Sequence, residues 1–336
     1  MGLWQSYRLR WKRRRWLWRA RQRGRELRSL RDRTASIRPG QILLFCCLRN
    51  ELVRLPWFLD YYRNLGVSQF LIVDNGSEDG SAEYLCAQED VSVWHTTASY
   101  RGAHYGVDWI NDLLRRYGTG HWCLTVDPDE FLVYPFSDSR PLKALTDWLE
   151  ASGTRAFPAM LLDMYPKGPI TAQPYRAGTD PLTIACWFDS GNYTFRRNPD
   201  LGNLWIQGGP RSRAFFADNP AKAPALNKIP LVRWRRGYAY ISSTHMMLPR
   251  GLNLTYDRSG GEIISGCLLH PKFLDTLTTK AEEETQRGQH FAAGAEYRAY
   301  LEGLRAQPDL WTRWSEHYIN WRQLEILGLM SKGNWT

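Results

Sequence analysis

Residues 42–74 read ILLFCCLRNELVRLPWFLDYYRNLGVSQFLIVD, and this stretch decides the fold. It opens with a continuous apolar run, 42–47, which is typical of a strand buried on both faces of a parallel sheet. Residues 52–66 then carry apolar side chains at helical spacing and end at Gly66, a residue that commonly terminates helices. A second apolar run, 69–74, completes a strand–helix–strand unit. The stretch therefore predicts parallel strands joined by a crossover helix.

The alternation of helix and strand continues down the chain. It predicts an α/β protein with a Rossmann-like, mostly parallel sheet and helices on both faces. Beyond residue 166 the sequence is rich in Gly, Pro and Arg, which predicts loops with short strands. The helices expected after the first unit are 81–88, 102–117 and 142–149, and the strands are 91–95, 121–126 and 156–165.

Polar residues gather where the predicted strands end, and ligands of such sheets bind beyond the carboxyl ends of the strands. In the sequence DPDE, Pro128 fixes the backbone between Asp127 and Asp129, and two carboxylates this close repel unless a cation or proton intervenes. Oxygen ligands suit Mg²⁺ or Mn²⁺, which substrate phosphates often help to hold. The sequence therefore predicts a divalent cation site for a phosphate-bearing ligand. The rim residues expected there are Arg49, Asn50, Glu51, Asp74, Asn75, Ser77, Asp79, Arg101, Asp127, Asp129 and Glu130.

Several common nucleotide-binding and hydrolase motifs are absent from the sequence. It has no Walker P-loop, no G-x-G-x-x-G after a strand and no G-x-S-x-G elbow. This argues against a P-loop NTPase, a dinucleotide enzyme and an α/β-hydrolase. A nucleotide would be held in another way, and Asp74 is well placed to accept a hydrogen bond from a base N–H.

The positive charge of the protein is concentrated at its amino-terminal end. The 336 residues carry a net charge of +10, but residues 1–38 hold 14 Lys and Arg against Glu26 and Asp32, a local charge of +12. The remainder is therefore 10 − 12 = −2, which is close to neutral. This basic arm, residues 1–38, interleaves Trp with Arg, as segments that bind anionic membrane surfaces do. Nucleic acid and the absence of any partner are the alternatives, and no nucleic acid is expected because nothing else in the chain reads bases.

The location of the protein is predicted from its cysteines and its apolar runs. The six Cys show no CxxC spacing and are interpreted as reduced thiols of a reducing compartment. No apolar run approaches the roughly 20 residues that span a bilayer, and Arg stands where a signal peptide would be apolar. We expect a cytoplasmic protein held peripherally at the inner face of the cytoplasmic membrane. Removing the basic arm should then abolish membrane binding and spare turnover of soluble acceptors.

Several segments, taken in order and spacing, resemble the family 2-type glycosyltransferases. The likeness is greatest to a bacterial subgroup in which Arg-Asn-Glu follows the first strand, and it covers roughly residues 40–300. The segments that carry it are RNELVRLPWFLDYYRNLGVSQFLIVDNGSEDG, HWCLTVDPDEFLVYP, LLDMYPKGP, GGPRSR, NKIPLVRWRRGYAYISSTH, LLHPKF and KAEEETQRGQH…EYRAY.

The resemblance implies an A-type glycosyltransferase fold that binds a nucleotide-diphosphate sugar and a divalent cation. It implies Asp74 near the base, and Asp127 and Asp129 at the metal and diphosphate, with His270 completing the metal site. Arg211 would grip phosphate, and His245 would contact diphosphate or acceptor. A structural role is the alternative for both histidines, and an ordinary turn with an exposed Arg is the alternative for Arg211.

The resemblance also implies an inverting reaction, which needs a general base to deprotonate the acceptor hydroxyl. The usual acidic pair that supplies the base has no clear copy here. Asp163, at the end of the strand 156–165, is our predicted base, and Glu130 and Asp189 are the alternatives.

The sequence thus predicts a metal-dependent glycosyltransferase that acts on a saccharide or lipid-linked acceptor in surface polysaccharide or glycolipid synthesis. The alternatives are a nucleotidyltransferase acting on sugar phosphates and a non-catalytic carbohydrate- or membrane-binding scaffold. Trp311, Trp314, Tyr318 and Trp321 follow helical spacing and predict a packed carboxyl-terminal helix. The expected segments are the basic arm 1–38, a nucleotide-sugar-binding half 39–165, an acceptor- and metal-completing half 166–278, and a helical extension 279–336.

Overall fold

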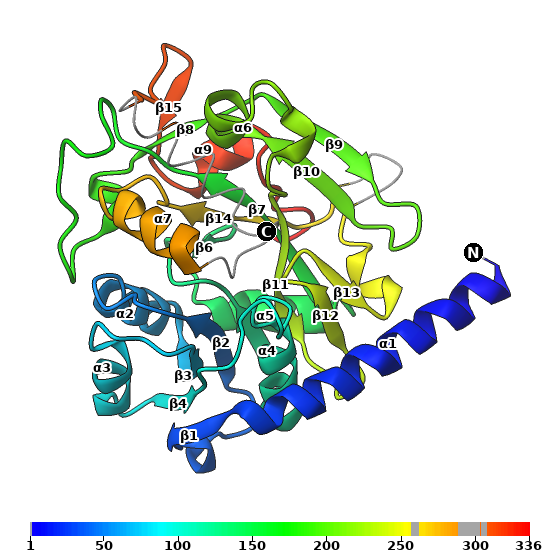
Figure 1. Cartoon of the computed structure of the whole chain (residues 1–336). Helices are drawn as coiled ribbons and strands as arrows, with labels where there is room; N and C mark the ends of the chain where they lie inside the picture. Colours follow the sequence, from blue (N-terminus) through cyan, green and yellow to red (C-terminus); the bar gives the residue numbers. More distant parts are fainter. Residues whose placement is uncertain (1, 257–261, 288–302, 304–307) are drawn as a thin grey trace.

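The computed structural model describes residues 2–256, 262–287, 303 and 308–336. Its centre is a nine-stranded sheet in the order β1-β4-β3-β2-β5-β11-β7-β14-β6, with helices on both sides (Figure 1). The predicted α/β class is confirmed. The strands of this sheet are β1 (Arg28–Arg31), β2 (Ile42–Leu48), β3 (Val67–Asp74), β4 (Val91–His95), β5 (Trp122–Thr125), β6 (Phe131–Val133), β7 (Ala156–Asp163), β11 (Asn227–Arg233) and β14 (Gly266–His270).

The first half of the sheet is the predicted parallel unit. Strands β4, β3, β2 and β5 run parallel to one another, and β14 runs parallel to β7. Strand β11 lies between β5 and β7 and is antiparallel to both. The amino-terminal end of β11 therefore lies at the same edge as the carboxyl ends of its neighbours, an arrangement that the sequence pattern did not predict.

Alternate side chains of β2 enter two separate apolar cores, one on each face of the sheet. Ile42 and Leu44 face the core covered by α2 (Leu55–Leu65) and α5 (Leu142–Ala151). Leu43 and Phe45 face the core covered by α4 (Val107–Leu113). This burial on both faces explains why the strand reads as a continuous apolar run.

Helix α2 forms as its sequence predicts. Proline stands in its first turn, where a missing N–H costs nothing. Leu55, Phe58, Leu59 and Tyr62 recur at helical spacing and are buried against the sheet. Gly66 ends the helix with φ of 99°, a left-handed conformation that favours glycine.

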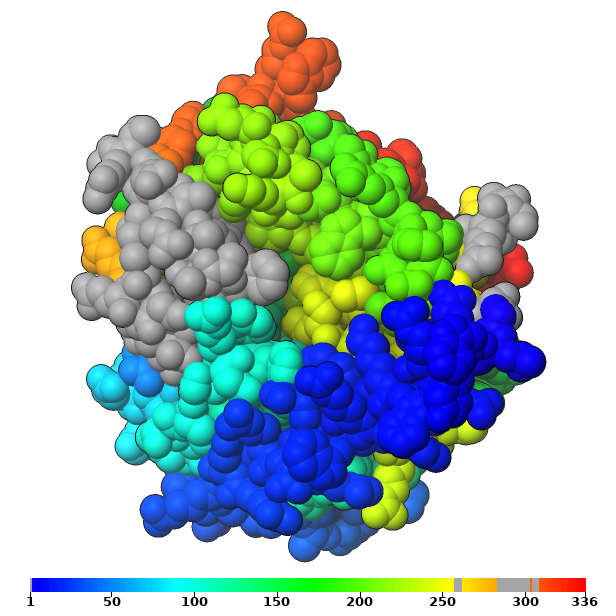
Figure 2. Space-filling view, turned by 45° about the vertical axis from the view of Figure 1, so that its right-hand side comes forward, coloured from blue at the N-terminus to red at the C-terminus, as the bar shows by residue number. Residues whose placement is uncertain are grey.

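The basic arm is packed onto the body of the protein rather than set apart from it. Its helix α1 (Leu3–Arg23) lies against α4, and the strand β1 pairs antiparallel with β4. The Arg19 guanidinium lies 2.9 Å from the Asp108 carboxylate, and the Trp109 indole donates to Glu26 over 2.9 Å. Figure 2 shows the blue helix lying against the yellow segment near residue 250.

Two predicted helices differ from the observed structure. The helix predicted over 102–117 is shorter, because turns occupy residues 101–106, α4 follows, and a π-type turn covers Leu114–Gly118. The helix predicted from the Trp311–Trp321 spacing is wrong: residues 311–320 form loop, turn and a short strand, and a helix starts only at Trp321. The parts of the predicted extension at 288–302 and 304–307 lie outside the described residues.

The remaining elements lie outside the nine-stranded sheet. They are α3 (Ser81–Ala87), β8 (Trp187–Asp189), β9 (Tyr193–Arg197), β10 (Leu204–Gly208), α6 (Gly209–Phe215), β12 (Ala239–Ser242), β13 (Met246–Leu248), α7 (Thr276–Arg287), β15 (Ser315–His317) and α9 (Trp321–Ile326), with 3₁₀ turns at Gly24–Glu26, Thr34–Ser36, Pro181–Thr183, Pro220–Lys222 and Arg250–Asn253.

In the part of the chain that the structure describes, no helix is both long and apolar enough to cross a membrane.

Candidate active site

Chemically active residues from distant parts of the chain meet at one edge of the sheet. Asp127 follows the end of β5, while Asp163 and His270 are register partners at the ends of β7 and β14. Lys228 stands at the start of the antiparallel strand β11 and so reaches the same edge. The fold therefore gathers acids, an imidazole and an ammonium group from four strands.

Of these residues, Asp127, Lys228 and His270 line a cavity of about 920 Å³, whereas Asp163 does not. Most of the predicted site residues line it, but several do not. Those that line it are Arg49, Glu51, Asn75, Asp127, Asp129, Glu130, Arg211, His245 and His270. Those predicted for the site but absent from the cavity wall are Asn50, Asp74, Ser77, Asp79, Arg101, Asp163 and Asp189.

A chain of charged contacts runs from the cavity into the protein. Asp129 Oδ2 lies 3.3 Å from His270 Nε2, and His270 Nδ1 lies 2.7 Å from Asp163 Oδ1. The other oxygen of Asp163 accepts from Arg211 Nε over 2.6 Å. All four side chains are buried or nearly so. Asp163 thus holds the imidazole ring of His270 in one orientation.

The pKa values along this chain follow from its charges. Burial alone would raise the pKa of Asp129, but His270, Arg54 and Lys272 outweigh burial and lower it. Burial would also raise the pKa of Asp163, and Arg211 and His270 lower it instead. The pKa of His270 is raised, because the two carboxylates outweigh the effect of its burial. This series of contacts therefore favours ionised Asp129 and Asp163 carboxylates on either side of a protonated His270 imidazole.

A second charged group surrounds Lys228. Its Nζ lies 2.8 Å from Glu130 Oε1 and 3.9 Å from Asp127 Oδ2. The Lys228 and Glu130 side chains are only 5% and 2% exposed, so each needs the other to offset the cost of burying its charge. The Asp127 side chain is 53% exposed and faces the cavity. Nearby protein atoms displace water from the Asp127 carboxylate, and this desolvation, followed by the negative charge of Glu130, raises the pKa of Asp127 to about 7.

The Asp129 carboxylate and His270 Nε2 fit a divalent cation, which would take the place of the proton on Nε2. Two ligands in neighbouring positions of a six-coordinate ion, each at about 2.1 Å, lie about 3 Å apart, close to the 3.3 Å observed here. Asp163 on the far side of the ring completes the carboxylate–histidine arrangement that orients metal ligands. Among the described residues no group of three or more His, Cys, Asp or Glu side chains is placed to hold a metal by itself. Phosphate oxygens and water would have to supply the remaining ligands.

Several predicted rim residues instead build the loop after β3. Asp74 is fully buried; its carboxylate lies 2.7 Å from His95 Nδ1 and accepts weakly from the Ser77 N–H. Asn50 Oδ1 accepts from the Glu78 N–H, and the Asp79 carboxylate accepts from Leu52 and Ser81. These contacts shape the loop, and the sequence could not separate shaping from ligand binding.

The two predicted bases that lie outside the cavity are both in ion pairs. Asp163 contacts Arg211 and His270, as described above. Asp189 contacts Arg213 Nε at 2.8 Å and the Tyr165 hydroxyl. Asp163 does not line the cavity, and its role as the base stays a prediction.

Several cavity residues were missed by sequence reasoning. Lys228, Lys272 and Lys280 line the cavity and add positive charge to it. Trp16, from the basic arm, also lines it, and its ring centre lies 4.5 Å from that of His104. A lysine in a strand or a tryptophan in a basic segment carries no local signal of this role, because only the packing of distant segments brings them there.

Comparison with known proteins gives little further information. No protein family model matches the chain, and no curated protein matches it. One similar solved structure is the mannosyltransferase PcManGT from Pyrobaculum calidifontis in complex with GDP-Man and Mn²⁺, at 18% identity and a TM-score of 0.27. The alignment covers 49% of this chain and 44% of that one, less than half of each. A likeness this weak carries no argument about the function of the chain described here.

Proposed function

We propose that the protein is a metal-dependent glycosyltransferase that moves a sugar from a nucleotide-diphosphate donor to a saccharide or lipid-linked acceptor. The observation that carries this proposal is the series of contacts Asp129–His270–Asp163 at the carboxyl edge of the sheet, where Asp129 and His270 line a cavity of about 920 Å³. The sequence segments that resemble family 2-type glycosyltransferases, and the A-type fold they imply, support the same assignment.

Positive side chains on the cavity wall suit a diphosphate. Arg211 and Lys272 line the wall near His270, and Arg49 lines it at the end of β2. Arginine forks bind phosphate oxygens bidentately, while lysine supplies a mobile point charge. Asp129 and His270 would hold the divalent cation, with Asp127 beside them. When bound, such a cation would neutralise negative charge that develops on the departing diphosphate.

The proposed inverting reaction needs a general base, and the cavity narrows the choice. Of the three acids considered from the sequence, only Glu130 lines the cavity, and it is our proposed base despite its contact with Lys228. His245 is the alternative. Its Nδ1 lies 2.6 Å from the Asn227 carbonyl oxygen, so Nδ1 carries the proton and Nε2 is left as the accepting atom. Glu130→Gln and His245→Gln, compared for turnover at saturating donor, distinguish the two.

The deciding experiment measures what the protein releases from nucleotide sugars. Purified protein is incubated with a panel of nucleotide sugars and soluble acceptors, with Mn²⁺ or with a chelator. We expect nucleoside diphosphate release from one donor that depends on the metal. Asp129→Ala should abolish it, because it removes one of two proposed protein ligands, whereas Asp147→Ala, on the exposed face of α5, should not change it.

Other outcomes favour the alternative functions. Pyrophosphate release from a nucleoside triphosphate and a sugar phosphate would identify a nucleotidyltransferase. Absence of any thermal shift with nucleotides, together with absence of turnover, would favour a carbohydrate- or membrane-binding scaffold. Either result would overturn the proposed transfer reaction.

We further propose that the protein works at the inner face of the cytoplasmic membrane, in the synthesis of a surface polysaccharide or glycolipid. Support comes from α1, which presents basic and aromatic side chains to the outside while its inner face packs on the body. Basic helices with exposed aromatic residues suit anionic membrane surfaces.

A further inference from the structure

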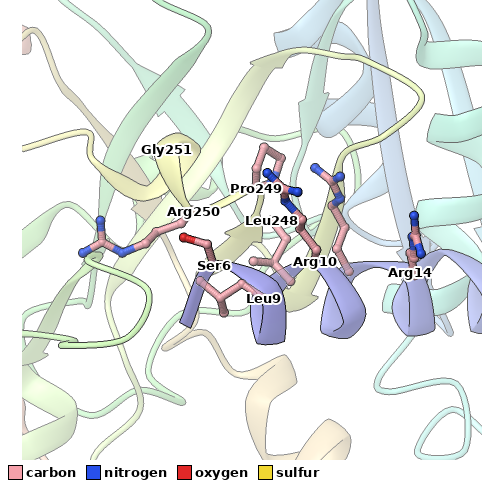
Figure 3. A pocket seen from close by; sticks show the side chains of 9 residues that line it. Ser6, Leu9, Arg10, Arg14, Leu248, Pro249, Arg250 and Gly251 are labelled. Atoms are coloured by element: carbon pink, nitrogen blue, oxygen red, sulfur yellow. The ribbon is translucent and has the colours of Figure 1, made fainter. Parts of the chain in front are cut away.

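A second cavity lies between α1 and the loop after β13, and it shares no lining residue with the candidate active site. Its volume is about 580 Å³, and Figure 3 shows α1 along one side with the loop facing it. We call it the arginine groove. Its walls are formed by Ser6, Leu9, Arg10, Arg13, Arg14, Leu248, Pro249, Arg250 and Gly251.

The groove has an excess of positive charge. Four arginines line it, and no Asp or Glu is among its described lining residues. Guanidinium groups that line the same groove carry like charges, and an anion bound there would offset their repulsion. The Nε atom of Arg13 is buried and has no hydrogen-bond partner within the part of the chain that the structure describes. Phosphate, with several acceptor oxygens, is the anion that such a cluster of forks recognises best.

The groove also has an apolar side. Leu9, Leu248 and Pro249 line it beside the arginines, and Leu248 is 1% exposed. A free phosphate ion gains no binding free energy from contact with an apolar surface. A phosphate that carries an apolar group can place its charge on the arginines and its first carbons on this side. The chemistry therefore fits an amphiphile with an anionic head.

The outer face of α1 indicates where that amphiphile is found. Trp4, Tyr7, Trp11 and Trp18 are between 51% and 72% exposed. At about 100° per residue they fall within a single arc of about 60° on the helix. Leu9, Arg13, Trp16 and Ala20 fall on the opposite side, and these face the body of the protein. An exposed aromatic stripe on a basic helix is a feature of helices that lie in a membrane interface.

We propose that the arginine groove binds the phosphate of an anionic lipid headgroup, while the aromatic stripe of α1 rests in the interface of the same membrane. Arg10 and Arg14 extend from α1 on the side of the loop (Figure 3), and at about 100° per residue they fall between the stripe and the inner face of the helix. The groove thus adds specific headgroup recognition to general charge attraction. This inference rests on the membrane part of the proposed function and does not depend on glycosyl transfer.

The test compares two pairs of exposed arginines on opposite flanks of α1. Arg10→Gln/Arg14→Gln removes two groove arginines, and Arg8→Gln/Arg15→Gln removes two from the other flank with the same loss of charge. Binding is measured by sedimentation with phosphatidylcholine vesicles containing phosphatidylglycerol. General attraction predicts equal losses, of roughly fivefold per arginine at most. We expect the groove pair to bind at least tenfold more weakly than the control pair.

Two further measurements separate headgroup recognition from its alternatives. Arg10→Lys/Arg14→Lys keeps the charge but loses the planar forks, and we expect several-fold weaker vesicle binding. If the Arg10→Lys/Arg14→Lys variant binds vesicles as the wild type does, or if the two Gln variants lose binding equally, the proposal of headgroup binding in the arginine groove is wrong. A soluble anion would be the ligand if inorganic phosphate raises the stability of the wild type but not of the Arg10→Gln/Arg14→Gln variant, while the two Gln variants bind vesicles equally. Asp129→Ala should bind vesicles normally, so failure of catalysis cannot be mistaken for failure of the groove.

Discussion

Lys228 and Glu130 form a buried ion pair whose members depend on each other for stability. Removing one charge leaves the other buried and uncompensated, which typically costs about 3–5 kcal/mol. We therefore expect Lys228→Met to lower the free energy of unfolding by about that amount. Lys228→Met/Glu130→Gln should recover a large part of the loss. Urea unfolding of the wild type, both single variants and the double variant measures the coupling directly.

Additive losses in that cycle would contradict the pairing. Lys143→Met is the matched control, since its partner Asp147 is exposed and the pair is worth little.

At the residue scale, the sequence predicted the acids of the site better than their partners. Asp127 and Asp129 stand next to a strand end, so their place on the rim could be read locally. The contact of His270 with Asp129 was proposed through the family resemblance, and the structure brings the two together. Asp163 was assigned a role in proton transfer, but the neighbouring charges that occupy it come from residues 48 and 107 positions away along the chain.

At the element scale, Asn111 joins α4 to β12 in the way that a neighbouring strand would. Its side-chain amide donates to the Tyr240 carbonyl and accepts from the Tyr240 N–H, each over 2.9 Å. Asn111→Ala would leave both backbone groups buried and unsatisfied, at about 1–3 kcal/mol each. We expect a total loss of about 2–6 kcal/mol in thermal or urea unfolding.

Asn64→Ala on the exposed side of α2 is the control for that substitution and should change stability by less than about 0.5 kcal/mol. A comparable loss in both variants would mean that the Asn111 contacts add nothing specific.

Elements with strong local patterns were predicted well, and those defined by distant contacts were not. The crossover unit around α2 carries its own apolar spacing and its own terminating glycine. Strand β1 has four exposed residues and no alternation, so only its pairing with β4 makes it a strand. The aromatic spacing near Trp314 imitated a helix, but Trp311 contacts Trp187 from a loop, Trp314 is exposed, and the helix begins only at Trp321.

At the scale of the whole molecule, buried tyrosines make the fold sensitive to alkaline pH. Burial raises the pKa of Tyr193 and of Tyr240 above their usual 10.0. In each case the folded protein favours the neutral hydroxyl over the phenolate. The contribution of these two tyrosines to stability is therefore fully present below pH 10, and it is lost as the pH rises toward their raised pKa in the folded protein.

We expect the free energy of unfolding to stay level from neutral pH to about 9 and to fall as the pH is raised further to about 11. Tyr240→Phe removes one of the two groups and should show a shallower decline than the wild type. Equal slopes would contradict a role for Tyr240, whatever the change in stability at neutral pH.

The basic arm behaves as part of the whole molecule, and its removal is predicted to affect more than membrane binding. Trp16 lines the candidate active site, and Arg19 Nη2 donates to the Gly102 carbonyl and contacts His104 beside it. A chain lacking residues 1–38 should therefore turn over soluble acceptors more slowly, contrary to the expectation from sequence. Trp16→Ala in the full chain should reproduce part of that loss, measured as nucleoside diphosphate release.

Strand β1 also affects the tendency of the protein to aggregate. It occupies the outer side of β4, whose Val91, Val93 and Trp94 are buried. A chain without β1 would present β4 as an open, apolar edge with unpaired backbone groups, the kind of edge that recruits strands from other molecules. The same segment that we propose binds the membrane would thus also protect the protein from aggregation. Shortened forms of the protein should scatter light at concentrations where the full chain stays clear.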